Sequence, residues 1–512
     1  MNTLQVRPAL LATGLLVALA GTAPAQAQTF SQPNPVLERI WEMGMEDSHL
    51  ESLAHSLLDS IGARLTGTPQ FDGANAWAVG TLREWGVDAR MEQYGTWRGW
   101  EQGLLHVDLL EPRRRTLEAS LLAWSGGTDG PVAGPVITVP ETESDAEFQA
   151  WLQNDVRGNF VAISFPEPSC RPIDHFDQWG SEGARERQTA LRAEQLERYR
   201  QMRTTGAATF RLQLEEAGAL GILELSWRGR TGINTVFGTN TESIPTISLS
   251  CEDYGRVWRL AENGSGPYLR VNAEAQDLGE VPAYNTIGIL RGTELPDEYI
   301  ILSAHYDSWQ AGDGATDNGT GSITMLEAMR ILSEVYPNPR RTIMIGLWGG
   351  EEHGLIGSRR FAYENPDIVE NMQALFNQDN GTGRIQNIGM QGLVNAHLHW
   401  NRWLEAIPSE ISDRLNIASP GNPSSGGTDH ASFICAGAPA FGLSSISWGY
   451  NPYTWHTNRD TYDKIVFEEV RHNATLIAML AYLASEDPER IDRTRREGNW
   501  PNCSPGRTSS GR

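Results

Sequence analysis

Hydrophobic residues in the second half of the chain form short apolar runs that alternate with segments of helical periodicity. The apolar runs are typical of buried strands and cover residues 299–304, 341–348, 372–376 and 438–444. Apolar positions recur at helical spacing over residues 320–335, 355–363 and 467–484. This alternation predicts an α/β fold: a mostly parallel sheet with helices on both faces.

The N-terminal region has the same texture. Helical periodicity predicts helices over residues 35–62 and 68–85, and we expect strands over 87–97 and 104–110. We interpret residues 28–111 as the first part of the domain that residues 282–490 complete.

The pattern changes over residues 112–281, where short strands are expected at 136–139, 160–165, 221–225 and 244–249. Residues 182–203 form a highly charged helical segment, which we interpret as a solvated surface helix. This segment has no cluster of metal ligands, so we expect a separate β-rich domain inserted into the first one. Residues 491–512 are a polar tail.

The first 27 residues resemble an export signal. Arg7 precedes an apolar stretch at residues 9–20, and Ala25-Gln26-Ala27 has the small-x-small pattern of a cleavage site. The apolar stretch is too short to span a membrane, and no Cys follows the cleavage site. We expect an exported protein, periplasmic or secreted, without a membrane anchor.

Composition narrows the function classes. The 512 residues are 39% hydrophobic and 21% charged, which is typical of globular proteins, and the net charge is -23. Such a negative chain argues against nucleic acid and anionic membranes as partners. The four cysteines, Cys170, Cys251, Cys435 and Cys503, allow three pairings in an oxidising compartment, and free buried thiols are equally compatible.

The candidate chemistry lies where predicted strands end. His305 and Asp307 follow the strand at 299–304 and share one face of it, and a Gly-rich acidic loop leads to Asp317. Glu351 and Glu352, then Asp379, then His456, lie in the same way after later strands or in Gly-rich loops. Imidazoles and carboxylates suit a divalent metal such as Zn²⁺, whereas a loop without Lys does not suit a phosphate.

The ordered motifs of residues 305–461 are similar to those of the M28 family of zinc peptidases. They are His-x-Asp at 305–307, Gly-Ala-x-Asp-Asn at 314–318, Glu-Glu at 351–352, Asp379, and His-Thr-x-x-Asp-Thr at 456–461. His-x-Asp-Ser-Trp and Gly427-Thr428-Asp429 resemble the plasma glutamate carboxypeptidase branch of that family. The branch contains an inserted protease-associated (PA) domain, which residues 112–281 are expected to form.

The resemblance implies a role for each motif residue. It implies that Asp317 bridges two Zn²⁺ ions, that His305 and Asp379 complete one site, and that Glu352 and His456 complete the other. It implies that Glu351 is the general base and that Asp307 orients His305. Two metals about 3.5–4 Å apart can share a hydroxide and polarise a peptide carbonyl, which agrees with this assignment.

Residues of the substrate pocket are expected around the last ligand. They are Asp429, Tyr450, Tyr453 and Trp455. Some M28 members use a Tyr beside the last ligand to stabilise the oxyanion, but this chain has Trp455 there. Whether Tyr450, Tyr453 or the metals alone take this part is open from the sequence.

These observations predict a dinuclear zinc exopeptidase that acts on peptides or dipeptides next to a free terminus, as an aminopeptidase or dipeptidase. Three alternatives stay open: a carboxypeptidase, a single-zinc glutaminyl cyclase, and a non-catalytic binding protein on the same fold. The sequence also leaves open whether the chain forms a homodimer.

Overall fold

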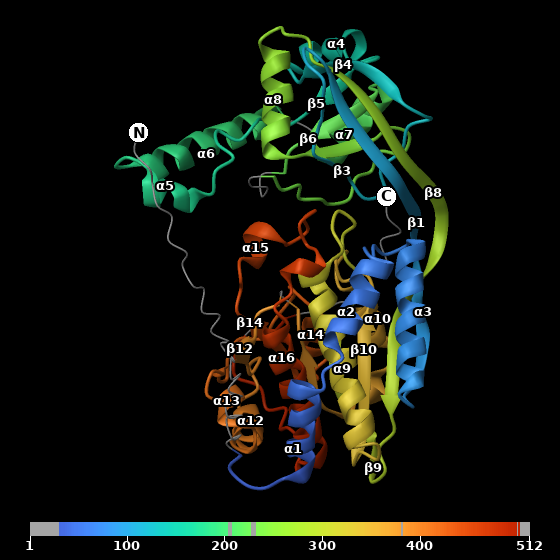
Figure 1. The fold of residues 1–512 in the computed structure, drawn as a ribbon, viewed down its shortest axis with the longest axis vertical. Coiled ribbons are helices and arrows are strands. Elements are labelled where there is room, and N and C mark those ends of the chain that lie inside the picture. Colours follow the sequence, from blue (N-terminus) through green and yellow to red (C-terminus); the bar gives the residue numbers. More distant parts are fainter. Residues whose placement is uncertain (1–29, 203–206, 227–231, 380–381, 499, 502–512) are drawn as a thin grey trace, which may run out of the picture.

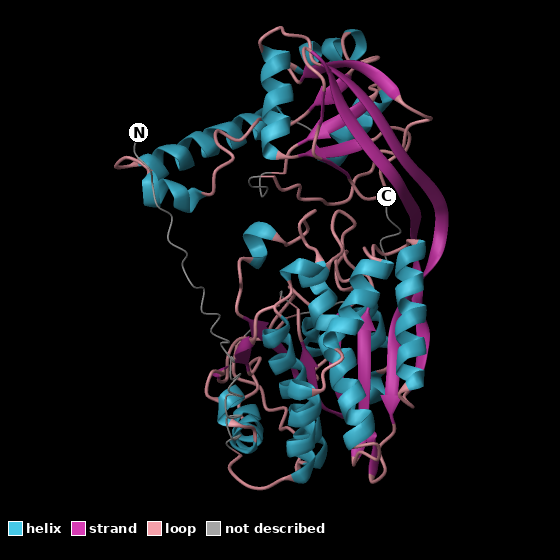
Figure 2. Ribbon diagram, in the orientation of Figure 1, coloured by secondary structure: helices cyan, strands magenta, loops and turns pink. Residues whose placement is uncertain are grey.

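The computed structural model describes residues 30–202, 207–226, 232–379, 382–498 and 500–501. The predicted signal peptide and Cys503 lie outside these residues. Figure 1 shows two lobes, a lower one that contains both chain ends of the described region and an upper one built from the middle of the sequence. Two long strands, β1 (Asp88–Glu111) and β8 (Tyr268–Leu290), run through both lobes. In Figure 2 this strand pair is continuous from one lobe to the other.

The lower lobe contains the predicted, mostly parallel sheet. Its strand order is β13-β12-β14-β11-β9-β10-β8, and β10, β9, β11 and β14 run parallel to their neighbours. Strands β8 and β12 join this central group in the antiparallel sense. The bounds are Leu295–His305 for β9, Arg341–Trp348 for β10, Met372–Asn377 for β11, Ile385–Gly389 for β12, Asn416–Ala418 for β13 and Ala440–Ser445 for β14. The α/β fold class predicted from the sequence is confirmed.

Helices cover both faces of this sheet because its strands are apolar on both sides. Successive residues of β9 point into different cores: Ile300 and Leu302 into one, Ile301 into the other. The first core is closed by α9 (Thr320–Val335) and α16 (Phe467–Glu486), which pack on each other and on β9. The second is closed by α10 (Ile356–Glu364) and α14 (His430–Cys435).

The N-terminal helices pack against the first core. The predicted helix over residues 35–62 consists of four short helical pieces: α1 (Pro35–Trp41), η1 (Glu42–Glu46), α2 (Leu50–Ala54) and η2 (His55–Ile61). The next helix, α3 (Pro69–Glu84), begins where predicted, because the Thr68 side chain accepts a hydrogen bond from the Phe71 N–H. The segment between η2 and α3 leads into the candidate site described below.

The upper lobe contains more helix than the sequence pattern predicted. Its short strands are β3 (Ala119–Leu121), β4 (Val132–Thr138), β5 (Phe160–Ala162), β6 (Gly221–Glu224) and β7 (Thr246–Leu249). The helices are α4 (Asp145–Asn154), α5 (Ile173–Trp179), α6 (Ala184–Met202), α7 (Ala207–Glu216) and α8 (Cys251–Glu262). The charged helix α6 was expected, whereas α4, α5 and α8 were not. Ser144 and Ser250 cap α4 and α8, a signal that the apolar pattern alone does not contain.

The two strands expected at 87–97 and 104–110 are one strand, β1. It pairs with β8 from Asp88 to Glu111 and absorbs irregularities at four places, including Gly99 and Gln102. Because bulges let a ladder continue past a local mismatch, the glycine-containing stretch between the two predicted strands stays within β1.

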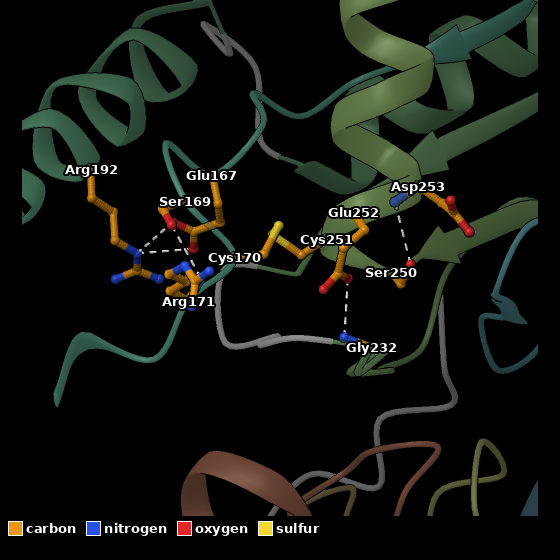
Figure 3. The surroundings of a disulfide bond; sticks show 10 residues. All are labelled: Glu167, Ser169, Cys170, Arg171, Arg192, Gly232, Ser250, Cys251, Glu252 and Asp253. Atoms are coloured by element: carbon orange, nitrogen blue, oxygen red, sulfur yellow. Dashed lines mark hydrogen bonds and ion pairs between the residues drawn. A yellow bond between two sulfur atoms is a disulfide. The ribbon is translucent and has the colours of Figure 1, made fainter. Parts of the chain in front are cut away.

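A disulfide joins two parts of the upper lobe. Cys170, in the loop before α5, is bonded to Cys251, the first residue of α8. Figure 3 shows the bridge with Arg192 of α6 on Glu167 nearby, an ion pair at 2.9 Å. The pairing of Cys170 with Cys251 is one of the cysteine pairings that the sequence left open. In Figure 1, α5 and α6 project from the upper lobe beyond this bridge.

Within the described ranges, no helix combines the length and apolar character needed to cross a membrane.

Candidate metal centre

The five candidate ligands lie together at the carboxyl edge of the lower sheet. His305 is the last residue of β9, and Asp317 lies in η3 (Ala315–Gly319), between β9 and α9. Glu352 follows β10, Asp379 follows β11, and His456 follows the short helix α15 (Tyr450–Tyr453). This is the edge at which open α/β sheets bind ligands.

The ligand atoms form two groups that share Asp317. In the first group, His305 Nε2 lies 3.3 Å from Asp317 Oδ1 and 3.2 Å from Asp379 Oδ1. In the second group, His456 Nε2 lies 2.9 Å from Glu352 Oε2 and 3.4 Å from Asp317 Oδ2. Each group could hold a metal ion, and the two oxygens of Asp317 face one group each.

The buried donors fit divalent cations. Asp317 Oδ2 and Glu352 Oε1 are buried and accept no hydrogen bond from any described residue. Burial, reinforced by the charge of Asp317, raises the pKa of Glu352 well above its ordinary value. Burial would also raise the pKa of Asp317, but its hydrogen bond with His305 and the charge of His456 lower it. Buried carboxylates are costly unless cations balance them, so a site of carboxylates and imidazoles matches Zn²⁺ or a similar ion.

Asp307 holds the neighbouring main chain. Its carboxylate accepts hydrogen bonds from the Thr66 hydroxyl at 3.1 Å, the Glu351 N–H at 3.1 Å and the Glu352 N–H at 3.4 Å. His305 Nδ1 lies 3.0 Å from the Asp307 carbonyl oxygen and 3.8 Å from its carboxylate. His305 thus contacts the main chain of Asp307 and, at a longer distance, its carboxylate.

Glu351 lies beside the first group without belonging to either. Burial raises the pKa of Glu351 well above its ordinary value, and the charges of Asp379 and Asp429 add to the effect while His305 opposes it. A carboxyl with a raised pKa close to a metal site is a candidate for proton transfer.

The pocket residues expected from the sequence lie in different surroundings. The Tyr450 hydroxyl forms a hydrogen bond with Asp317, and the ring borders a cavity of about 530 Å³ that Tyr453 also lines. Trp455 stacks on the His456 ring, with 3.8 Å between ring centroids. Asp429 is fully buried at the start of α14, and this burial raises its pKa to about 7.

Two residues that position Asp317 were missed by the sequence reasoning. Asp460 accepts hydrogen bonds from the Thr316 N–H at 2.7 Å and the Asp317 N–H at 2.9 Å. It belongs to the His-Thr-x-x-Asp-Thr motif, so the motif contained the signal. The buried Arg64 donates to four carbonyl oxygens around this loop, those of Gly62, Tyr306, Asp313 and Gly314. Nothing in the sequence connects Arg64 with a loop more than two hundred positions away.

An aromatic side chain contacts the second group directly. The Trp309 Nε1–H donates to Glu352 Oε2 at 2.8 Å and so fixes one carboxylate oxygen. Trp309 also packs against His353, which contacts Trp97 and Trp124 at the base of the upper lobe. Burial lowers the pKa of His353 to about 4, so this ring is neutral at pH 7. Aromatic residues from both lobes thus border the second group.

Comparison with known proteins assigns this part of the chain. Residues 285–481, which include all five candidate ligands, match the model of Peptidase family M28. This match and the carboxypeptidase Q relatives described next indicate that the chain is a metallo-exopeptidase.

Curated relatives match most of the chain. The chain is 26% identical over 451 residues to carboxypeptidase Q of Xenopus laevis, which covers 85% of this chain and 86% of that protein. It is 24% identical over 445 residues to carboxypeptidase Q of Homo sapiens, with 86% and 85% covered.

Solved structures agree on the fold. A peptidase M28 precursor from Shewanella amazonensis SB2B superposes with a TM-score of 0.64 at 23% identity, covering 90% of this chain and 98% of that one. A zinc aminopeptidase from Bacillus subtilis gives a TM-score of 0.55 at 18% identity, covering 87% and 97%.

Proposed function

We propose that the chain is a dinuclear zinc exopeptidase that hydrolyses the peptide bond next to a free amino terminus, as an aminopeptidase or dipeptidase. The position of Asp317 supports this proposal most directly. One of its oxygens faces His305 and the other faces His456, each within 3.4 Å of the ring nitrogen. A carboxylate so placed between two sets of donors suits a bridging ligand.

The two zinc ions would be held by residues of both groups. His305 and Asp379 would hold one ion, Glu352 and His456 the other, and Asp317 would contact both. Bound zinc would supply a nucleophile at neutral pH and a Lewis acid for the peptide carbonyl. The zinc aminopeptidase among the structural neighbours agrees with this choice of metal.

Glu351 is the proposed general base. It accepts the proton of the attacking water and delivers it to the nitrogen of the leaving group. Asp307 positions the main chain for this step, because its carboxylate accepts hydrogen bonds from the N–H groups of both Glu351 and Glu352. Adjacent residues are thereby fixed for two different tasks.

Tyr450 is the proposed donor to the oxyanion. Its hydroxyl already reaches Asp317, and burial raises its pKa well above the ordinary value, so it stays protonated at neutral pH. A protonated hydroxyl at this place can donate to the oxygen of the tetrahedral intermediate. Trp455, which occupies the position next to the last ligand, stacks on His456 instead.

Carboxylates outnumber imidazoles around the metal-free centre. The groups that act most strongly on the pKa of Glu351 are His305 and the carboxylates Asp379, Asp429 and Glu352. Those that act on Glu352 are His305 and the carboxylates Asp317, Asp307 and Asp379. Two bound zinc ions would offset most of these negative charges, so the substrate panel below, and not the charge of the metal-free centre, decides which terminus is recognised. The name carboxypeptidase Q among the relatives makes attack at the carboxyl terminus the second candidate.

We also propose that the protein is exported, that residues 1–27 are removed, and that the upper lobe is a PA-like domain. The Cys170–Cys251 disulfide supports an oxidising compartment.

The test combines zinc content with a substrate panel of aminoacyl anilides, dipeptides and N-blocked dipeptides. We expect two zinc ions per chain and hydrolysis only where the amino terminus is free. Cleavage of N-blocked dipeptides would favour the carboxypeptidase, and a single zinc with cyclisation of N-terminal Gln would favour the cyclase.

Two matched variants separate the base from the ligands. Glu351→Gln is expected to keep both zinc ions and to lower kcat by about 10²–10⁴-fold. Glu352→Gln is expected to lose zinc as well as activity. Glu468→Gln, which changes a side chain that is 77% exposed on α16, is the control and should match the unmodified protein. Retention of activity by Glu351→Gln would contradict the assigned base.

A further inference from the structure

A segment of the upper lobe lies along the loop that contains His456. The Val236 N–H donates to the His456 carbonyl oxygen at 2.9 Å. The Asn458 N–H donates to the Asn234 carbonyl oxygen at 3.0 Å, and the Asn234 N–H donates to the Asn458 side chain at 2.9 Å. Thr235 and Thr457, between these contacts, form an antiparallel bridge. Residues 232–237, which we call the upper-lobe segment, thus pair with the ligand loop as a short ladder.

Side chains reinforce this ladder. Glu118, in the upper lobe before β3, accepts hydrogen bonds from the Asn458 side chain at 3.0 Å and from Arg459 at 3.2 Å. Arg459 also donates from Nε to the Gly232 carbonyl oxygen at 3.0 Å. The two residues that follow the ligand His456 by two and three positions are therefore both tied to the upper lobe.

His456 needs such support because of its backbone. Its φ is 57°, in the left-handed region that residues with a β-carbon rarely adopt. Such a conformation persists only where the surroundings fix it. The ring is fixed as well, since Phe237 of the upper-lobe segment meets it edge-on at 5.0 Å and Trp455 stacks on it.

The other group of ligands is held differently. His305 ends a strand in the middle of the sheet, its carbonyl oxygen accepts from the Ser322 hydroxyl at 2.8 Å, and its ring contacts the Asp307 main chain. Asp379 follows the neighbouring strand β11. The supports of this group belong to the lower lobe.

We propose that the upper-lobe segment and Glu118 are positioning elements for the metal held by Glu352 and His456, so that the inserted lobe controls the occupancy of one of the two metal positions. This inference rests on the proposed dinuclear zinc centre. It makes the upper lobe part of the catalytic apparatus, although each ligand residue belongs to the lower lobe. Loosening the contacts should weaken one zinc ion and leave the other in place.

The test is the double variant Glu118→Ala/Asn458→Ala, in the full-length protein. Zinc is removed stepwise with a chelator of known affinity and counted per chain, and kcat and KM are measured over a range of free zinc. We expect one of the two ions to bind about 10–100-fold more weakly, as is typical when a group that supports a metal ligand is removed. The kcat should fall at low free zinc and recover when zinc is added, with KM changed much less.

Two controls separate positioning from general damage. Glu141→Ala/Asn263→Ala removes the same residue types from exposed places in the upper lobe away from the ligand loop, and should keep both ions. The single variant Glu118→Gln, in which Asn458 is intact, retains an oxygen acceptor for the Asn458 side chain. It should bind both zinc ions nearly as tightly as the parent protein. The Tm of the metal-free double variant should stay close to that of the metal-free parent.

Each outcome decides the inference. Two zinc ions bound by the double variant with unchanged affinity would overturn it. Equal weakening of both ions, together with a lower Tm of the metal-free protein, would overturn it too, because the contacts would then serve the fold alone. A parent protein with only one zinc ion would refute the dinuclear centre itself, a failure that is seen before any substitution is made.

Discussion

The two halves of the candidate metal centre are built in different ways. His305 and Asp379 lie at the ends of adjacent parallel strands, whose positions are fixed by the hydrogen bonds of the sheet. His456 lies in a loop with a left-handed backbone and takes part of its support from another lobe. A sheet supplies a rigid site at little cost in local strain, whereas a loop ligand needs contacts from outside its own segment.

The largest effect is expected at the residue that the two halves share. Asp317→Asn removes a negative oxygen from both groups, so both zinc ions should be lost. We expect kcat/KM to fall by on the order of 10³-fold or more, because the metals supply several kcal/mol to the reaction. Zinc counts per chain and hydrolysis of a dipeptide measure this. Asp313→Asn, in the same loop, is the control, and an equal loss in that variant would speak against a special role of Asp317.

A smaller loss of activity is expected at Tyr450, which lies close to the His456 loop. Tyr450→Phe should retain both zinc ions and lower kcat by about 10²–10³-fold, with little change in KM, because the hydroxyl serves mainly the transition state. Tyr453→Phe is the matched control, since Tyr453 is 41% exposed in the same helix. If both variants keep full kcat, the metals alone stabilise the oxyanion.

Substitution of Arg64, which holds the Asp317 loop, should lower both stability and zinc affinity. Arg64→Ala leaves four carbonyl oxygens around the Asp317 loop without their donor, at about 1–3 kcal/mol for each one that stays buried and unpaired. We expect the free energy of unfolding in urea to fall by about 3 kcal/mol and zinc affinity to fall by about 10-fold. Arg471→Ala, which breaks an exposed pair with Glu51, should change stability by less than about 1 kcal/mol.

The smallest effect on activity is expected far from both halves, at Asp487. Burial would raise its pKa, but hydrogen bonds from His399, the Glu489 N–H and Arg402 lower it well below the ordinary value. Because the folded-state pKa lies below the unfolded value of about 3.9, this carboxylate contributes stability above that pH and loses it as the pH falls further. Asp487→Asn should therefore reduce the free energy of unfolding at pH 7 and flatten its decline in acid.

Unfolding curves at several pH values would measure the effect of Asp487→Asn, with kcat at pH 7 as the comparison. A variant with a parental acid profile would show that the three hydrogen bonds do not act as described. Asp492→Asn, an exposed carboxylate nearby in the sequence, is the control.

The sequence predicted the parts of the molecule that depend on local patterns. The apolar run at 341–348 coincides with β10, and the periodic segment at 320–335 coincides with α9. The candidate ligands could be found for the same reason, since each follows a strand or lies in a Gly-rich loop. Their roles as ligands and base remain predictions for the experiments above.

The parts that the sequence did not predict depend on contacts between distant segments. Arg64 acts through carbonyl oxygens of residues 306–314. Since every residue has a carbonyl group, the sequence cannot show which of them a side chain binds. The pairing of residues 232–237 with the His456 loop is of the same kind. Asp429 was expected at the substrate pocket from its motif, and this stays a prediction; its complete burial at the start of α14 was not predicted from the sequence.

The long ribbon of β1 and β8 also sets the order in which the chain can fold. Asp88 pairs with Ile289, so the start of β1 has no partner strand until the whole upper lobe has been synthesised. At about 5–20 residues per second, this takes roughly 10–40 s. In the folded protein, β8 lies between β1 and β10 and so connects β1 to the rest of the sheet. A strand without its neighbour leaves backbone groups unpaired and so promotes aggregation, and pairings between distant residues form slowly. The nascent protein is therefore expected to need protection by a chaperone over this interval, and shortening the upper lobe should shorten that need.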